Sequence, residues 1–434
     1  MKISTKKVPF EYIEKIKKPK HRPPLRPMFL LTLIVRIGAI FDLFSAKFKY
    51  TTERMEKTKG KPCLILMNHS SFIDLKIVSK IMFPRRYCIV CTSDGFVGFG
   101  KELLMRLLGC IPTNKFVSNP SLISDMRAAF NKNVSVLMYP EASYSFDGTA
   151  TPLPRKMGFL LKKLNVPVVS IITEGAFSRE PLYNCLQKRD VKVSAHVKCL
   201  FTPEELKEKS VAELDAILDE TFNFDGFAWQ KKNKIEIKED FRADGLNRIL
   251  YKCASCGNEG KMEGKGTKLL CHHCKKEYEM DIYGSLKASN GETEFSHIPD
   301  WYAWQRQEVR KEILEGSYKL ETDVDIGVLV DYKAIYMVGE GKLTHTPEGF
   351  ELIGCNGKLN YTQKAMASYS LYSDYYWYEI GDVICIGNND ILYYCFPKCE
   401  GDVLQRLELL LRKFIKSEEK SEIKRKNKGK SIEF

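Results

Sequence analysis

Two polar segments, each placed directly after an apolar run, constrain this chain more than any other feature. The first, residues 68–74, brings a histidine and an aspartate within five positions of each other, and the second, residues 139–143, places a carboxylate after a proline. Ligands of open α/β sheets bind where strands end, so both segments are candidates for a site. A neutral histidine held by an aspartate can act as a general base, which makes His69 and Asp74 the candidate catalytic pair.

The first half of the chain alternates apolar runs with helical patterns, which indicates an α/β layered sheet. Residues five apart do not share one face of a helix. We therefore expect His69 in the loop before a helix and Asp74 in its first turns, pointing back. The expected strands are 63–67, 87–92, 134–139, 166–173 and 193–201, and the expected helices are 71–82, 100–108, 121–131, 155–164 and 203–220.

The beginning of the chain suggests a membrane surface. Residues 1–26 hold nine Lys or Arg, which could attract anionic lipid headgroups or nucleic acid phosphates, or form a solvated tail. Residues 28–44 are mostly apolar, but they are too few to span a bilayer and include Arg36 and Asp42. We expect an amphipathic helix that lies in the membrane interface, with an ordinary core-facing helix as the alternative.

Four of the fourteen cysteines form two C-x-x-C pairs separated by 14 residues: Cys253, Cys256, Cys271 and Cys274. Two such pairs complete a closed tetrahedral site of four thiolates, so we predict a structural zinc. His272 or His273 could replace one cysteine. Because we find no secretory signal, we expect the remaining cysteines to be reduced thiols in a cytosolic compartment.

The last part of the chain changes from a helical pattern to strands. Residues 297–315 predict a helix, and residues 317–400 hold several strand patterns followed by a helical pattern at 402–416. Such an arrangement resembles a pleckstrin-homology-like barrel. Residues 417–434 are charged, lack a core pattern and are expected to be disordered.

Four blocks in the first half of the chain resemble the glycerolipid acyltransferase superfamily, the group that includes 1-acylglycerol-3-phosphate acyltransferase. The family carries N-H-x-x-x-x-D, then a glycine with an arginine-containing block, then F-P-E-G-T-R-S, then a V-P-[VI] strand. This chain keeps the order at residues 68–74, 109–115, 139–145 and 166–168. The resemblance covers about residues 30 to 220.

The resemblance implies transfer of an acyl chain from acyl-CoA or acyl carrier protein to the hydroxyl of a lysophospholipid such as 1-acylglycerol-3-phosphate, in phospholipid biosynthesis. His69 would remove the proton of the acceptor hydroxyl, and Asp74 would hold His69 in the correct tautomer. The substrate-binding residues implied by the matching blocks and their neighbours are Asn68, Lys115, Glu141, Ser143, Arg155 and Lys156.

The chain departs from the family pattern at positions that matter for the acceptor. Ala142, Ser143 and Tyr144 stand where the family has Gly, Thr and Arg, and Lys115 falls at or near the arginine of the second block. Arginine binds phosphate bidentately, whereas Lys is a point charge and Tyr is neutral, so these residues do not identify the headgroup of the acceptor. The alternatives are a catalytically weak lipid-binding or regulatory protein on the same fold and, less favoured, nucleic-acid binding by the zinc ribbon.

The expected fold is therefore an α/β acyltransferase-type layered sheet with an N-terminal amphipathic helix, a four-cysteine zinc ribbon and a β-rich C-terminal domain. We expect a protein on the cytoplasmic side, peripherally associated with the inner face of the membrane, with membrane lipids and the acyl donor as partners. The expected boundaries are 1–50 for the basic segment and interface helix, 51–222 for the acyltransferase domain, 223–285 for the ribbon and its lead-in, 286–416 for the accessory domain and 417–434 for the tail.

Overall fold

A seven-stranded sheet carries both polar segments, in the order β2-β8-β7-β3-β6-β4-β5. Strands β3 to β7 run parallel, β8 is antiparallel to β7, and β2 is parallel to β8. The alternating first half is confirmed as a mixed α/β structure. The strands are β2 (Lys49–Glu53), β3 (Leu64–Met67), β4 (Tyr87–Thr92), β5 (Cys110–Thr113), β6 (Ser135–Met138), β7 (Val168–Glu174) and β8 (Ser194–Phe201).

The computed structural model describes residues 3–398 apart from 116, 118, 120, 155, 368–372 and 379. The expected helix 402–416, the tail 417–434 and Arg155 lie outside the described residues. Among the described residues, no helix combines the length and apolar character that crossing a bilayer requires.

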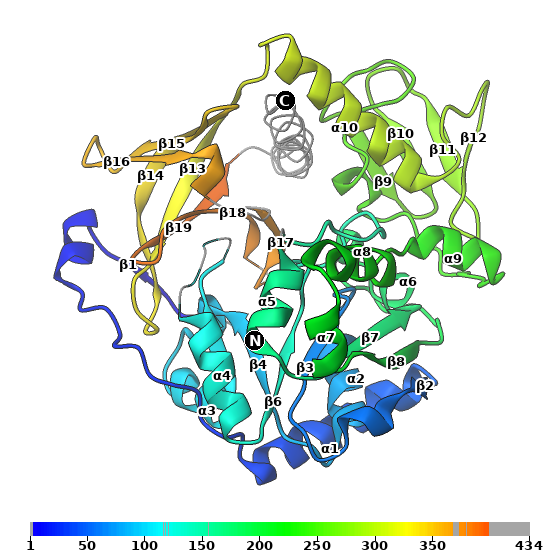
Figure 1. Cartoon of the computed structure of the whole chain (residues 1–434). Helices are drawn as coiled ribbons and strands as arrows, with labels where there is room; N and C mark the ends of the chain where they lie inside the picture. The colour runs from blue at the N-terminus through cyan, green and yellow to red at the C-terminus, as the bar shows by residue number, and fades with distance from the viewer. Residues whose placement is uncertain are drawn as a thin grey trace, which may run out of the picture.

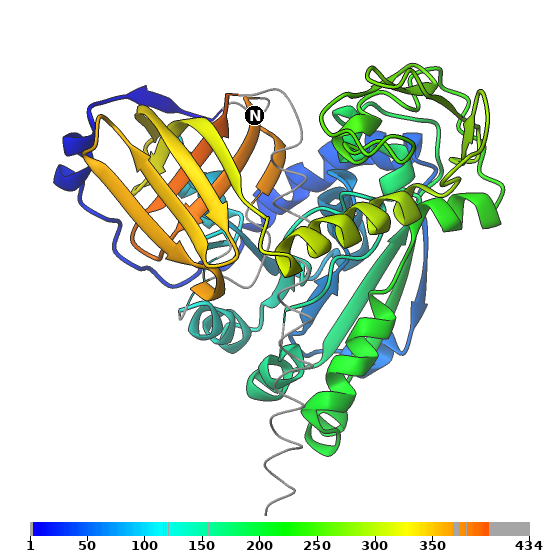
Figure 2. The same ribbon diagram turned by 90° about the horizontal axis from the view of Figure 1, so that it is seen from above.

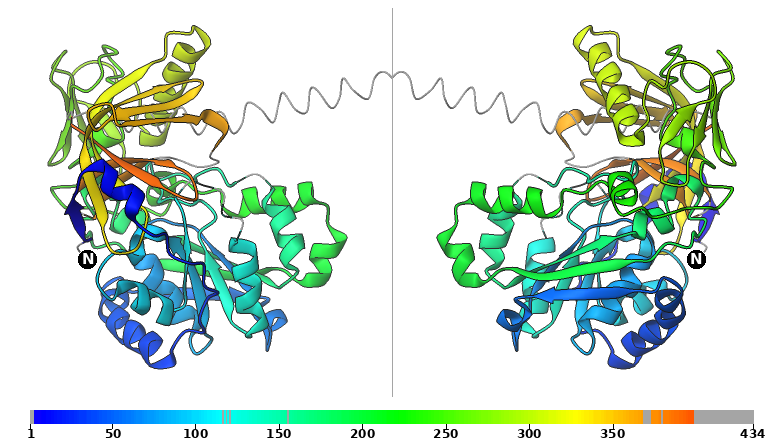
Figure 3. Two further views of the ribbon diagram at one scale, coloured as in Figure 1. Left: turned by 90° about the vertical axis from the view of Figure 1, so that its left-hand side faces the viewer. Right: turned by 90° about the vertical axis from the view of Figure 1, so that its right-hand side faces the viewer.

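Helices cover both faces of the first sheet (Figure 3). Strands β3 and β6 are buried along their whole length, as the continuous apolar runs of central parallel strands require. Leu64 and Leu66 pack on one side of β3 and Ile65 and Met67 on the other. The first side is covered by α4 (Leu122–Asn131), α5 (Met157–Leu164), α7 (Pro203–Glu208) and α8 (Val211–Thr221), and the second by α1 (Phe29–Ser45) and α2 (Ile73–Met82).

A four-stranded antiparallel sheet in the order β12-β11-β10-β9 follows the first sheet along the chain. Its strands are β9 (Met262–Lys265), β10 (Lys268–Cys271), β11 (Glu277–Met280) and β12 (Leu286–Ala288). The long helix α10 (Ile298–Leu314) then leads to the third sheet, so that the second and third sheets lie at opposite ends of this helix (Figure 2). The shorter helices are α3 (Lys101–Leu107), α6 (Ala176–Arg179) and α9 (Gly226–Lys232).

The third sheet confirms that the C-terminal region is rich in strands. Its order is β16-β15-β14-β13-β19-β18-β17, with antiparallel neighbours throughout. The closer resemblance to a pleckstrin-homology-like barrel stays a prediction. The strands are β13 (Leu320–Leu329), β14 (Ile335–Thr346), β15 (Gly349–Gly354), β16 (Leu359–Lys364), β17 (Ser373–Trp377), β18 (Gly381–Gly387) and β19 (Leu392–Pro397).

The N-terminal segment joins the third sheet, which the sequence did not predict. Strand β1 (Thr5–Lys7) pairs in parallel with β14, and Ile3 and Ile13 are buried with the core of that sheet. The chain then crosses the molecule to reach α1 beside the first sheet (Figure 1). Part of the basic segment is therefore folded against the protein and is not a solvated tail.

Candidate active site

The two polar segments meet at one edge of the first sheet. Strand β3 lies between β6 and β7, with Leu66 opposite Met138 and Met67 opposite Ile171. Because these strands are parallel, their carboxyl ends reach the same edge. His69 follows β3 and Tyr139 follows β6, so the fold brings together segments that are 70 residues apart.

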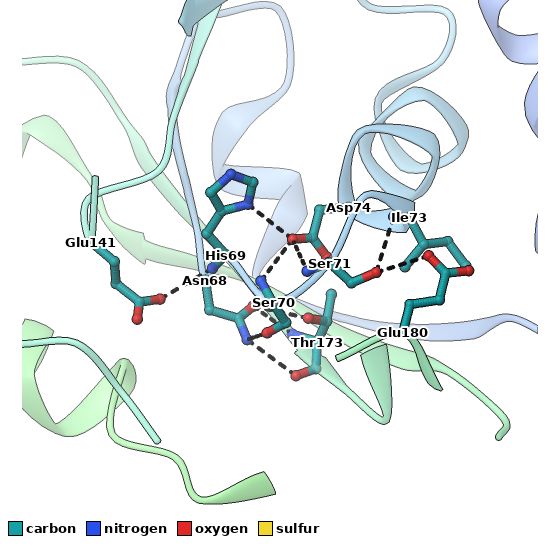
Figure 4. Close-up of polar contacts among 9 residues, drawn as sticks. All are labelled: Asn68, His69, Ser70, Ser71, Ile73, Asp74, Glu141, Thr173 and Glu180. Atoms are coloured by element: carbon teal, nitrogen blue, oxygen red, sulfur yellow. Dashed lines mark hydrogen bonds and ion pairs between the residues drawn. The ribbon is translucent and has the colours of Figure 1, made fainter. Parts of the chain in front are cut away.

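His69 and Asp74 form the pair that the sequence predicted (Figure 4). The Nδ1 atom of His69 lies 3.0 Å from Oδ2 of Asp74, which sits fully buried in the first turn of α2. The same oxygen accepts from the backbone N–H groups of Ser70 at 2.8 Å and Ser71 at 3.1 Å. An ionised carboxylate can only accept, so Nδ1 carries the proton and Nε2, on the ring edge away from Asp74, is left as the base.

Glu141 braces the loop that carries His69. One carboxylate oxygen accepts from the backbone N–H of His69 at 3.1 Å, and the other accepts from the N–H of Thr151 at 2.9 Å. A further backbone bond runs from Ser145 N to His69 O at 2.7 Å. The structure thus gives Glu141, which is buried, a positioning role, while contact with an acceptor stays a prediction.

Asn68 is buried and ties the same loop to β7. Its Oδ1 accepts from the backbone N–H of Thr173 at 2.8 Å and from the Thr173 hydroxyl at 3.1 Å, and its Nδ2 donates to Thr173 O and to Ser70 Oγ. Both the oxygen and the nitrogen of the Asn68 side-chain amide are therefore hydrogen-bonded, which fixes the direction in which the chain leaves β3. Substrate contact by Asn68 also stays a prediction.

Two tyrosines enclose the imidazole of His69. The ring centroid of His69 lies 3.8 Å from that of Tyr139 and 3.7 Å from that of Tyr144, and both pairs are stacked. Burial raises the pKa of each phenol well above its ordinary value, and the charge of Asp74 adds to this, so both rings stay neutral. Phe72 meets Tyr144 edge-on at 5.4 Å. The side chain of His69 is 15% exposed, so the imidazole is not fully covered by its neighbours.

Sequence reasoning did not find this aromatic enclosure. The sequence marks Tyr144 only as the residue that replaces the family arginine, and it gives no role to Tyr139. The signal was present, because both tyrosines flank the Pro-Glu block that follows β6. Stacking between side chains that are 70 or more residues apart could not be read without the strand order.

Lys115 is held by two carboxylates. Its Nζ bonds Oδ2 of Asp374 in β17 and lies 3.2 Å from Oδ2 of Asp94, which also accepts from Nε1 of Trp377 at 2.7 Å. The Lys115 side chain is only 7% exposed. Burial alone would lower the pKa of Lys115, but the charges of Asp374 and Asp94 outweigh it and hold this pKa well above its ordinary value.

The remaining predicted contact residues differ in their surroundings. Ser143 is half-buried, and its hydroxyl oxygen has no hydrogen-bond partner among the described residues. Ala142 adopts a positive φ of 57°, the backbone conformation that the family glycine would take without strain. Lys156 is exposed at the start of α5.

The four predicted cysteine ligands converge beside the second sheet, where Cys271 is the last residue of β10. The sulfur atoms of Cys253, Cys256, Cys271 and Cys274 all lie within 4.8 Å of one another, and the closest pairs are 3.7 and 3.9 Å apart. Thiolates at about 2.3 Å from a tetrahedral zinc would be about 3.8 Å apart, so the set fits this metal. His272 is bonded to Glu263 instead, and neither His272 nor His273 belongs to the cluster.

The match to a known protein family falls on the part of the chain that holds His69. A family model described as Acyltransferase matches residues 48–174. No curated protein matches the chain in sequence. Among solved structures, the chain is similar to the 1-acyl-sn-glycerophosphate (LPA) acyltransferase PlsC from Thermotoga maritima, with 16% sequence identity and a TM-score of 0.35 over 44% of this chain and 76% of that chain.

Proposed function

We propose, from the acyltransferase domain that residues 48–174 of this chain form, that the protein transfers an acyl chain from a thioester donor to the hydroxyl of a lysophospholipid. The observation that carries the proposal is the hydrogen-bonded pair of His69 and Asp74 at the carboxyl end of β3. The donor would be acyl-CoA or acyl carrier protein. The sequence resemblance alone gives 1-acylglycerol-3-phosphate as an example of the acceptor.

The proposed reaction uses the chain's own residues for the proton transfers. Nε2 of His69 accepts the proton of the acceptor hydroxyl while the oxygen attacks the thioester carbonyl. The new ester C–O bond forms, the C–S bond breaks, and the proton passes from His69 to the leaving thiolate. Asp74, 3.0 Å from Nδ1, stabilises the imidazolium that exists between these two transfers.

Helix α1 supports peripheral attachment to a membrane. Only Ala39 and Leu43 of this helix are buried, and they face α2, whereas Phe41 is 81% exposed and Phe44 is 85% exposed. An apolar helix face of this kind marks a surface for lipid or for a partner. The other exposed apolar side chains of the helix are Phe29, Leu30, Ile34, Val35, Ile37 and Ile40.

Basic side chains beside the start of α1 support contact with anionic headgroups. Arg26, Lys61, Arg85 and Arg86 line a pocket of about 250 Å³ at the amino ends of β3, β4 and β6. The guanidinium of Arg86 lies 5.8 Å from the ring centre of Phe29. Cations next to an interfacial apolar helix sit at headgroup depth and attract the anionic lipids of a cytoplasmic leaflet. We therefore place the protein at the inner face of the membrane.

The four-cysteine cluster supports a structural zinc. A site of four thiolates has no open position for a substrate, so the metal would stabilise the second sheet. We assign it no part in acyl transfer.

The test measures acylated product by mass spectrometry, with purified full-length protein, acyl-CoA or acyl carrier protein as donor, and a panel of lysophospholipids. We expect turnover that is lost in His69→Ala. The matched control is His21→Ala, because His21 also bonds an aspartate, Asp125, at 3.0 Å but outside the site. Turnover that survives in His69→Ala, or no turnover with any acceptor, would contradict the proposal and favour a lipid-binding role.

A further inference from the structure

The third sheet contributes a carboxylate to the surroundings of the candidate site. Asp374 lies in β17 and bonds Lys115, which follows β5 of the first sheet. Asp94 follows β4, the neighbouring strand, and completes the group. This group, Lys115 with Asp94 and Asp374, is named the acidic cluster below.

The three residues of the acidic cluster carry a net negative charge, because one lysine faces two carboxylates; the Lys101 ammonium also acts on Asp94 from outside the cluster. Asp94 is buried and accepts a hydrogen bond from the indole N–H of Trp377 at 2.7 Å, which stabilises its negative charge. The Lys115 ammonium is already engaged by Asp374 and Asp94. A dianionic phosphate that approached Lys115 would have to displace Asp374 and would face Asp94 as a like charge.

Tyr144 links the acidic cluster to the catalytic histidine. Its ring stacks on His69 at 3.7 Å; burial raises the pKa of its phenol, and the charges of Asp74 and Asp374 add to this while that of Lys115 opposes it. The third sheet closes against the same segment, because Tyr375 of β17 stacks on Phe146 with ring centroids 3.9 Å apart. Tyr144 therefore lies within the electrostatic influence of both the His69–Asp74 pair and the acidic cluster.

We propose that Asp374 is a specificity-determining residue that excludes acceptors with a phosphomonoester, so that the acceptor is a lysophospholipid whose phosphate is a diester. The proposal rests on the proposed acyl transfer. A diester phosphate carries a single charge and is covered by its second substituent, so it does not need a free cation beside it. The neutral Tyr144, where the family has an arginine, removes the second phosphate-binding cation from the same place.

The test compares kcat/KM for lysophosphatidate, a monoester, with that for lysophosphatidylglycerol, a diester. We expect the wild-type chain to prefer the diester. Asp374→Asn frees Lys115 and removes one negative charge, so it should raise the relative use of lysophosphatidate by roughly tenfold. Adding Lys115→Met to Asp374→Asn should abolish this gain.

The matched control is Asp382→Asn. Asp382 lies in β18 of the same sheet, is paired with Arg248 at 2.6 Å and is 28% exposed at its side chain, as is Asp374. It should leave the preference unchanged. A wild-type chain that prefers lysophosphatidate would overturn the proposal even if the variants failed to fold, as would a folded Asp374→Asn with an unchanged preference. An absence of turnover with every acceptor would instead refute the acyl transfer itself.

Discussion

Replacing Asp74 by asparagine tests the candidate site most directly. The substitution keeps the shape of the side chain but removes the negative charge 3.0 Å from Nδ1 of His69. At an effective dielectric constant of about 20, a full charge pair at this distance is worth about 5 kcal/mol. If the imidazolium is about half formed in the transition state, the loss is about 2.5 kcal/mol, which corresponds to a fall in kcat of roughly 100-fold.

The assay is acyl transfer at saturating donor, with kcat and KM determined separately for each variant. Because Asp74 is buried beneath His69, we expect KM to change little. Asp125→Asn is the matched control, since Asp125 is also buried and bonds a histidine, His21, away from the site. A fall in kcat of less than about threefold in a folded Asp74→Asn protein would refute the assignment of His69 and Asp74 as the base and its partner.

Three further predictions concern zinc binding, the pH dependence of stability and binding to membranes. Metal analysis should give about one zinc per chain, and Cys256→Ser should lose it and lower the Tm; a folded chain without metal would contradict the zinc assignment. The hydrogen bond that His297 donates to Asp225 raises the pKa of His297 above 6.5, so the stabilisation from this pair is complete below about pH 6.5 and is lost as the pH rises through the raised value. His297→Gln should therefore lower the unfolding free energy by about 1 kcal/mol more at pH 6 than at pH 9 in urea titrations. An equal loss of unfolding free energy at the two pH values would refute the stabilising role of this hydrogen bond. Phe41→Ser should weaken binding to anionic vesicles in flotation assays by roughly tenfold, whereas Phe159→Ser, an exposed position on the opposite face of the first sheet, should not; equal effects would contradict docking through α1.

The strands that position the site could be predicted because they are central and parallel. Their burial on both faces requires continuous apolar runs, and such runs mark strands without any knowledge of their partners. The expected strand 87–92 coincides with β4, and the expected strand 63–67 differs from β3 by one residue. The position of Asp74 in the first turn of α2 followed from the five-residue spacing and the geometry of a helix.

Two of the strands that escaped prediction lack an apolar signature, whereas β5 (Cys110–Thr113) escaped although Cys110 and Ile111 are buried. Strand β2 is polar and almost wholly exposed at the edge of the first sheet, and β1 consists of three exposed residues, Thr5–Lys7. Both are strands because a neighbouring strand offers free backbone groups, which is information that local sequence does not contain. The basic composition of the first residues suggested a membrane-binding segment, whereas the backbone of β1 is used to extend the third sheet.

Lys115, near the candidate site, also has partners that local sequence cannot predict. The sequence has a lysine at or near the position where the family that it resembles has an arginine, and from this a weaker phosphate contact is a reasonable expectation. Its partner Asp374 lies 259 residues further along the chain, beyond the expected boundary at residue 222. Since the ion pair and the stack of Tyr375 on Phe146 both cross that boundary, the third sheet forms part of the surroundings of the base. For the proposed acyl transfer, a change of acceptor specificity is therefore to be sought as much in β17 as in the loops that follow β3 and β6.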